Sequence, residues 1–308
     1  MKYRHAFHAG NFADVHKHVA LLALLRLLTR KDKGLLLLDT HAGRGLYDLG
    51  AAAARKAGEA EDGIGRLTGL SAAAATAAQA AAATALPAEI VDYLETVRAI
   101  TQGSGLRNAY PGSPLIALAT LRRQDRAVFI ETQIEEHIAL REAVRNFVRS
   151  TAHRDGPSAD RVTIECADGY SRLGNWLPPL ERRALVLIDP PYEDSSGDFQ
   201  AVVTAAQECL RRLANAVIAI WYPIKLGKET DAWRKRLQAA LPALAGGAPT
   251  PTCALELWVH PRDTRVGLNG SGMLVINPPW QFAERADEWL PSLHRKLDPE
   301  GRGGWSIS

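Results

Sequence analysis

The amino-acid sequence predicts an α/β fold with a mostly parallel, doubly wound sheet. Five short apolar runs, typical of strands buried on both faces, recur along the 308 residues, at 34–39, 127–131, 162–167, 184–189 and 216–221. Segments with helical periodicity separate these runs, notably 133–148 and 199–213. Because strand and helix alternate, we expect parallel strands with helices on both faces of one sheet.

The ends of the chain complete this prediction. A helix is predicted from Asp14 to Thr29, with Asp14 placed to start it. Two late strands, near 253–259 and 272–276, have no clear helix between them and are expected to form an antiparallel hairpin at the sheet edge. The tail after Lys296 contains several glycines and is expected to be loosely ordered.

One segment, residues 51–108, interrupts the alternation of strand and helix. It is rich in alanine, has high helical propensity and contains no run typical of a buried strand. Residues 90–100 within it carry a continuous apolar face at helical spacing. We interpret the segment as a small helical insertion in a single domain that spans residues 1–308.

The composition narrows the class of protein. Hydrophobic residues make up 46% and charged residues 23%, as in a soluble globular protein, and the net charge of +3 excludes a polycationic coat. The three cysteines are far apart, which argues against a disulfide framework and fits a reducing cytoplasm. The apolar segment 19–28 is too short to span a bilayer. The histidine-rich N-terminus lacks a complete ligand set, so no metal is expected.

The strongest local motif is Asp189-Pro190-Pro191-Tyr192 at the end of a predicted buried strand. Ligands bind at the carboxyl edge of such sheets. Asp189 and the Pro190 carbonyl can accept hydrogen bonds from the two N–H groups of an exocyclic amine. These bonds would draw the nitrogen out of conjugation with the ring and free its lone pair. The prolines fix the backbone that points this carbonyl into the site. Tyr192 offers a face on which a base can stack. The motif therefore predicts amino-group methylation, although a stiff turn would also explain it.

A glycine loop follows the first predicted strand, with Asp39 before Gly43 and Gly45. The dinucleotide fingerprint fails here, since its third glycine would fall at Asp48. An acid ahead of the glycines instead resembles the loop that approaches the methionine part of S-adenosylmethionine. His41 lies inside the loop, so its imidazole or backbone is expected at the cofactor.

Glu131 ends the second predicted strand, where a carboxylate can accept bonds from both hydroxyls of a ribose. The usual spacing is about 20 residues beyond the glycine loop, yet Gly45 and Glu131 are 86 apart. The insertion accounts for the difference, because Ser113 and Pro114 resemble a helix start only 18 residues before Glu131. We therefore predict Ser113 as an N-cap that faces the charged end of the cofactor.

Asp168-Gly169 follows the third strand, where the carboxylate can accept a bond from the adenine amine of the cofactor. On its own it is equally well explained as an ordinary turn. The four acids that follow successive strands favour a binding edge, because unpaired acids are not expected at packed strand ends. These acids are Asp39, Glu131, Asp168 and Asp189.

Together these residues resemble the RlmJ (YhiR) family of 23S rRNA adenine-N6 methyltransferases. The motifs that carry the resemblance lie at residues 3–18, 38–43, 110–114 and 189–192, and the first is the most specific. The resemblance implies a Rossmann-like class I methyltransferase fold that uses S-adenosylmethionine. It also implies a monomer that acts on 23S rRNA, either protein-free or in an early assembly intermediate.

The resemblance further implies individual roles. Asp189 would be the catalytic residue, and Tyr3, His5 and Lys17 would belong to an N-terminal lid, about residues 1–18, over cofactor and adenine. Cofactor contacts are implied for His18, His41, Ser113, Glu131, Asp168, Gly169 and Asp189.

Three alternatives remain open at this point. The same chemistry could act on DNA adenine, a guanine amine or a protein amide. A nicotinamide-dependent oxidoreductase could use the same fold, although the missing third glycine argues against it. A non-catalytic RNA-binding module would leave the complete cofactor edge unexplained.

Overall fold

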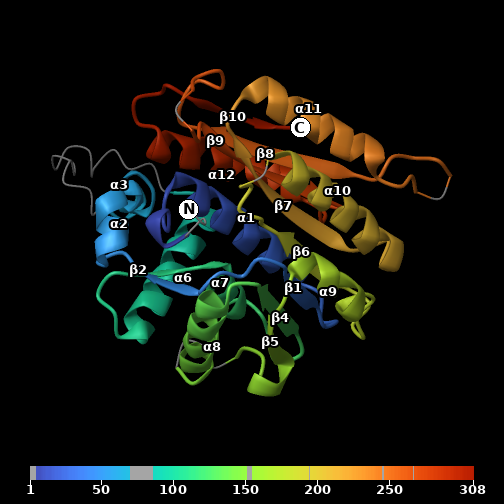
Figure 1. The fold of residues 1–308 in the computed structure, drawn as a ribbon, viewed down its shortest axis with the longest axis horizontal. Helices are drawn as coiled ribbons and strands as arrows, with labels where there is room; N and C mark the ends of the chain where they lie inside the picture. Colours follow the sequence, from blue (N-terminus) through green and yellow to red (C-terminus); the bar gives the residue numbers. More distant parts are fainter. Residues whose placement is uncertain (1–4, 70–85, 151–154, 194, 245, 266) are drawn as a thin grey trace.

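An eight-stranded sheet runs through the molecule with helices on both sides (Figure 1). The computed structural model describes residues 5–69, 86–150, 155–193, 195–244, 246–265 and 267–308. The strand order is β10-β8-β9-β7-β6-β1-β4-β5. The strands are β1 (Leu36–Asp39), β4 (Arg126–Glu131), β5 (Val162–Cys166), β6 (Ala184–Ile188), β7 (Val217–Ile224), β8 (Thr252–Trp258), β9 (Gly270–Ile276) and β10 (Gly304–Ile307).

The predicted doubly wound sheet is confirmed. Strand β1 lies between β4 and β6 and is parallel to both, and β5 and β7 extend the parallel part on either side. The chain thus turns from one half of the sheet to the other beside β1, which is the switch point where such folds bind ligands. All five predicted buried runs form these five strands, with ends that differ by at most three residues.

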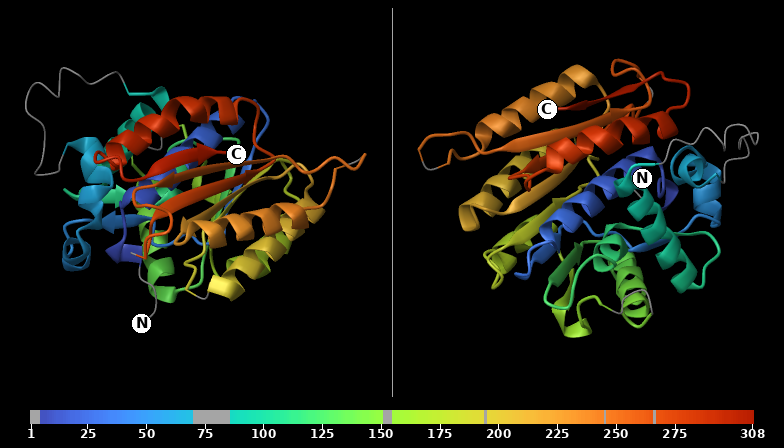
Figure 2. Two further views of the ribbon diagram at one scale, coloured as in Figure 1. Left: turned by 90° about the horizontal axis from the view of Figure 1, so that it is seen from above. Right: turned by 180° about the vertical axis from the view of Figure 1, so that it is seen from behind.

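Two apolar cores, one on each face, explain why the strands are apolar throughout. In β1, Leu37 packs into one core while Leu36 and Leu38 pack into the other. The first core is covered by α1 (Phe12–Leu28), α6 (Ala88–Ser104), α7 (Ser113–Leu118), α8 (Ile134–Val148) and α12 (Phe282–Leu297). The second is covered by α9 (Gly169–Trp176), α10 (Ser195–Arg212) and α11 (Gly227–Ala240). Figure 2, left, shows α12 and α11 on opposite faces.

The C-terminal prediction is only partly right. Strands β8 and β9 do pair as an antiparallel hairpin, but β9 also pairs with β7, and β10 pairs with the far side of β8. The hairpin is therefore not the edge of the sheet. The expectation of a loosely ordered tail is wrong at residues 304–307, because these residues form β10, the edge strand.

The N-terminal helix begins two residues earlier than predicted. Helix α1 starts at Phe12, and the side chain of Asn11 caps it by accepting the backbone N–H of Asp14 at 2.9 Å. Asp14 therefore lies in the first turn, where its charge favours the positive end of the helix dipole. The helix is buried for most of its length and packs against β9 and α12.

The described part of the insertion is mainly helical. It contains α2 (Ala52–Ala57), α3 (Glu59–Asp62), α4 (Ile64–Thr68) and α6, whereas most of the alanine-rich tract, residues 70–85, lies outside the described residues. A two-stranded ribbon of β2 (Leu46–Asp48) and β3 (Ala109–Pro111) joins its two ends. The predicted lid, about residues 1–18, is also described only in part. Residues 1–4 lie outside the described residues, His5–Phe7 form a 3₁₀ turn (η1), and α1 follows. Its closure stays a prediction.

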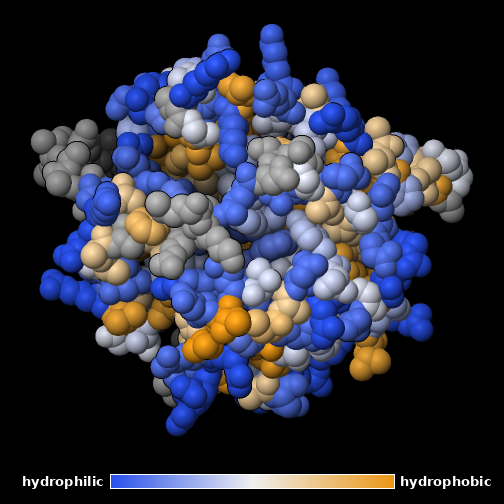
Figure 3. Space-filling view, in the orientation of Figure 1, coloured by the Kyte–Doolittle hydropathy of each residue, from blue (hydrophilic) through white to orange (hydrophobic). Residues whose placement is uncertain are grey.

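The visible surface is mainly hydrophilic, with small apolar patches between charged side chains (Figure 3). Among the described helices, none is both long enough and apolar enough to cross a bilayer.

Candidate active site

A cavity of about 890 Å³ opens at the carboxyl edge of the parallel strands. Three of the four predicted acid-bearing strands meet here, since β6, β1 and β4 are neighbours. The start of α1, helices α3 and α4 of the insertion, and the loop between β8 and β9 line other sides. The volume falls in the range of small-molecule sites. Predicted site residues that line it are His5, Lys17, His18, His41, Ser113, Glu131, Asp189, Pro190 and Tyr192.

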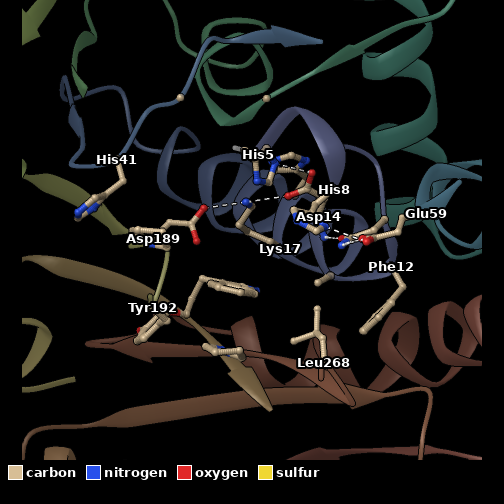
Figure 4. Close-up of a pocket in the computed structure, with 18 of the residues that line it drawn as sticks. His5, His8, Phe12, Asp14, Lys17, His41, Glu59, Asp189, Tyr192 and Leu268 are labelled. Carbon is tan, nitrogen blue, oxygen red and sulfur yellow. Dashed lines mark hydrogen bonds and ion pairs between the residues drawn. The ribbon is translucent and has the colours of Figure 1, made fainter. Parts of the chain in front are cut away.

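Lys17 joins the N-terminal helix to the Asp-Pro-Pro-Tyr motif (Figure 4). Its ammonium group donates to Asp189 at 2.7 Å and lies 2.9 Å from a carboxylate oxygen of Asp14. Asp14 in turn accepts the backbone N–H of Gly10 at 3.0 Å and lies 2.9 Å from His5 Nε2. The charges of Asp14 and Lys17 are buried and that of Asp189 is partly buried, so each depends on its partner.

Pairing keeps Lys17 and Asp14 ionised. Burial lowers the pKa of Lys17, but the carboxylates of Asp14 and Asp189 outweigh burial and raise it well above its usual value. Burial likewise acts to raise the pKa of Asp14, yet His5 and Lys17 hold it well below the usual range. Lys17 therefore remains a cation beside Asp189 at neutral pH.

The loop after β1 forms the opposite side of the cavity. Asp39 accepts a hydrogen bond from the hydroxyl of Ser113 at 2.7 Å and another from the backbone N–H of His41 at 3.1 Å. Burial raises the pKa of Asp39 to about 7, although the hydrogen bond from Ser113 acts to lower it. Burial also lowers the pKa of His41 to about 4, so its imidazole is neutral at physiological pH.

The predicted role of Ser113 as an N-cap is wrong. Gly112 occupies the cap position of α7, and no side chain makes a capping bond there. Ser113 is the first helical residue, and its hydroxyl is directed to Asp39 instead. Pro114 was predicted at the first helical position and lies at the second, still in the first turn, where the helix needs no N–H from it.

The glycine loop brings its backbone close to the cavity. Gly43 and Gly45 have φ values of +61° and +77°, which glycine adopts without strain. The N–H of Gly43 donates to Glu131 at 2.9 Å, and that of Gln133 donates to the same carboxylate at 2.7 Å. Burial raises the pKa of Glu131. Glu131 therefore ties the loop after β1 to the end of β4.

Asp168 and Gly169 are the two predicted site residues of the described chain that do not line the cavity. Asp168 is exposed and caps α9 by accepting the backbone N–H of Tyr170 at 3.2 Å. Gly169 packs so tightly against the β1 loop that a Cβ would lie 2.1 Å from the carbonyl oxygen of Thr40. Close packing therefore explains Gly169, and a cofactor contact from either residue stays a prediction.

Tyr192 adopts a strained backbone, with φ at +51°, and is only 2% exposed. Its ring packs against those of Phe199 and Trp221, with centroids 4.8 and 5.8 Å away, and its hydroxyl donates to the carbonyl of Trp221 at 2.7 Å. Little of the ring is thus open to a ligand. Stacking on Tyr192 remains a prediction.

His18 is buried deep in the cavity wall. Its Nδ1 lies 2.9 Å from the hydroxyl of Tyr110, which lies 3.0 Å from that of Tyr93 in the insertion. Burial lowers the pKa of His18 to about 3, so the side chain is neutral. Tyr3, assigned to the substrate side, lies outside the described residues.

Two residues of the site were not identified from the sequence. Asp14 was treated as a helix start, although its spacing of three from Lys17 places both side chains on one helix face. Trp221 was included only as the end of a strand, although an aromatic residue at the carboxyl edge of a parallel sheet is itself a signal of a binding site.

Comparison with known proteins now identifies the family. The family model described as "Ribosomal RNA large subunit methyltransferase D, RlmJ" matches residues 32–308. Two curated proteins named "Ribosomal RNA large subunit methyltransferase J" are similar over all of this chain and 98% of their own length. The one from Haemophilus influenzae is 39% identical and the one from Escherichia coli 38%. A crystal structure of a Legionella pneumophila protein has a TM-score of 0.78 and 29% identity, over 98% of both chains. The chain therefore belongs to the RlmJ family of methyltransferases.

Proposed function

We propose that the protein transfers a methyl group from S-adenosylmethionine to the N6 amine of an adenine in 23S rRNA. The observation that carries this proposal is the position of Asp189 and Pro190. They follow β6 at the switch point of the sheet and line the same cavity as the glycine loop of β1. The relatives' names, which refer to large-subunit ribosomal RNA, support the choice of substrate.

The residues around β1 fit the cofactor. The turn at Gly43 lets the backbone approach a ligand closely, and the Glu131 carboxylate beside it can accept bonds from ribose hydroxyls. Asp39 is buried behind the cavity wall and accepts hydrogen bonds from Ser113 and His41, so it would position these two lining residues at the cofactor. When bound, S-adenosylmethionine supplies the reactive methyl on a sulfonium.

Asp189 and Pro190 would hold the amine. The carboxylate of Asp189 and the carbonyl of Pro190 accept its two N–H bonds, which turns the nitrogen lone pair towards the methyl group. Bound S-adenosylmethionine would supply the methyl group, and Asp189 would accept the proton that the amine loses when its nitrogen–carbon bond replaces the carbon–sulfur bond of the sulfonium. Lys17 fixes the orientation of this carboxylate. Catalysis comes from orientation and electrostatics.

The substrate side combines basic and aromatic groups. His5, Lys17 and Tyr192 line the cavity, and Tyr3 belongs to the segment that we propose closes over it as a lid. An adenine can reach Asp189 only when it is unpaired or flipped out of its helix. We therefore propose a loop or hairpin target in protein-free RNA or an early assembly intermediate, methylated in the cytoplasm by a monomer.

Methyl transfer from labelled S-adenosylmethionine tests the proposal directly. Protein-free 23S rRNA and duplex or single-stranded DNA are supplied as separate substrates, and the digested products are analysed as nucleosides. We expect label in N6-methyladenosine from the RNA. Label in DNA adenine alone would favour the alternative substrate, and label in another nucleoside would refute the choice of amine.

A further inference from the structure

Trp221 is the large aromatic side chain of the cavity that remains partly exposed beside the reactive carboxylate. It lies on β7, the strand next to β6, and its ring centre is 5.8 Å from the ammonium group of Lys17. That ammonium group is itself 2.7 Å from Asp189. The ammonium group of Lys17 thus lies close to both the indole of Trp221 and Asp189, the proposed amine acceptor.

Buried polar groups hold this indole in place. Its N–H donates to the hydroxyl of Ser271 at 2.9 Å, and Ser271 is completely buried on β9. The same hydroxyl lies 2.9 Å from Nδ1 of His16, which is also completely buried. Burial of polar groups is costly unless they are hydrogen-bonded, so this arrangement stabilises one orientation of the ring.

The opposite side of Trp221 is fixed as well. Its backbone carbonyl accepts the hydroxyl of Tyr192, and the Tyr192 ring lies against the indole with centroids 5.8 Å apart. Tyr192 is 2% exposed, so it supports Trp221 more than it faces the cavity. An aromatic ring that is anchored at its N–H and still open to a cavity is suited to stack on a flat ligand.

We propose that Trp221 provides the aromatic face on which the purine ring of the target base stacks, and that Ser271 and His16 are positioning residues for the indole. The inference rests on the proposed function, because it presumes a planar base whose amine reaches Asp189. It assigns to Trp221 the stacking surface that the motif alone suggested for Tyr192.

Two apolar substitutions test the stacking itself. Both replace the indole by a smaller side chain, but Trp221→Phe keeps an aromatic face and Trp221→Leu does not. We expect the Leu variant to have a kcat/KM for RNA about 5- to 140-fold below wild type, the range known for base stacking, and the Phe variant to stay within a few-fold. Binding of S-adenosylmethionine, measured by calorimetry, should be unchanged in both. Equal kcat/KM in the Leu and Phe variants would overturn the inference.

A double-mutant cycle tests the positioning role of Ser271. Ser271→Ala should lower kcat/KM in the wild-type background but have no effect in the Trp221→Leu background, because its action passes through the indole. Additive losses in the double variant would overturn this role. Wild-type protein that forms no N6-methyladenosine would instead refute the proposed function, so the two failures are distinguishable.

Discussion

On the α1 side of the cavity the carboxylates of Asp14 and Asp189 share the ammonium group of Lys17, whereas on the β1 side Asp39 is held by the neutral groups of Ser113 and His41. The consequences for ionisation are opposite. The pKa of Lys17 is raised and that of Asp14 lowered, so both remain charged. Burial raises the pKa of Asp39 to about 7 and lowers that of His41 to about 4, which favours the neutral forms.

This difference shows that burial alone does not decide the charge of a group. Lys17, Asp14 and Asp39 are buried and His41 is partly buried, but only the groups with a counter-charge are held ionised. The α1 side is complete in itself and is suited to hold a neutral amine. The β1 side lacks a counter-charge among the hydrogen-bond donors of Asp39.

The largest effect is expected at the amine side. Asp189→Ala should lower kcat for methyl transfer at least about 100- to 1000-fold, because it removes a preorganised acceptor at the reacting nitrogen. Steady-state kinetics with RNA measure this, and circular dichroism checks the fold. Asp287→Ala, an exposed acid on α12, is the matched control and should retain full activity. Normal turnover by Asp189→Ala would contradict the assigned role.

Lys17→Met tests whether the charge cluster depends on its cation. Removing Lys17 leaves two carboxylates without their shared partner, so the free energy of unfolding should fall by about 3–5 kcal/mol. Urea denaturation measures this loss. The double variant Asp14→Asn/Lys17→Met should recover part of the stability but not the activity, since Asp189 still lacks its partner. A single variant as stable as wild type would show that the pairing contributes little.

Gly169→Ala probes the packing of the β1 side. The new Cβ would lie 2.1 Å from the Thr40 carbonyl oxygen, and overpacking of this kind costs about 1–3 kcal/mol. A lower unfolding midpoint in urea is expected. Gly103→Ala, in a helix where a Cβ meets nothing within 4 Å, is the control and should not destabilise the protein. Unchanged stability with weaker cofactor binding would instead favour a direct contact of Gly169 with the cofactor.

The last prediction concerns the pH dependence of stability. Asp39 has an ordinary pKa of 3.8 and a folded value of about 7, so between these values the folded state binds more protons than the unfolded state. Its contribution to stability therefore falls as the pH rises through this window. Asp39→Asn has no carboxyl group at this position to titrate. The free energy of unfolding of the variant minus that of wild type should therefore increase from pH 5 to pH 8. Urea unfolding at both values measures it, and a constant difference would contradict the raised pKa.

Much of the fold was predictable because the sequence pattern of a segment reflects the burial of that segment. Buried parallel strands need continuous apolar runs, and the acids at their carboxyl ends necessarily share one edge. The prediction failed where a segment's role depends on a distant partner. The tail after Lys296 appeared irregular because its strand is completed by β8, and Ser113 resembled a cap because its bond to Asp39, 74 positions away, leaves no local trace.

The sequence by itself therefore determined the class of fold, the edge of the sheet that carries the site, and nine of the residues that line the cavity. Only the tertiary structure decided which groups meet there. Lys17 and Asp189 are 172 positions apart, and His16 and Ser271 are 255 apart. Strand order and helix packing bring these pairs within hydrogen-bond distance, and local periodicity carries no information about either. The charge of each group then follows from its neighbours, since burial with a partner and burial without one shift a pKa in opposite directions.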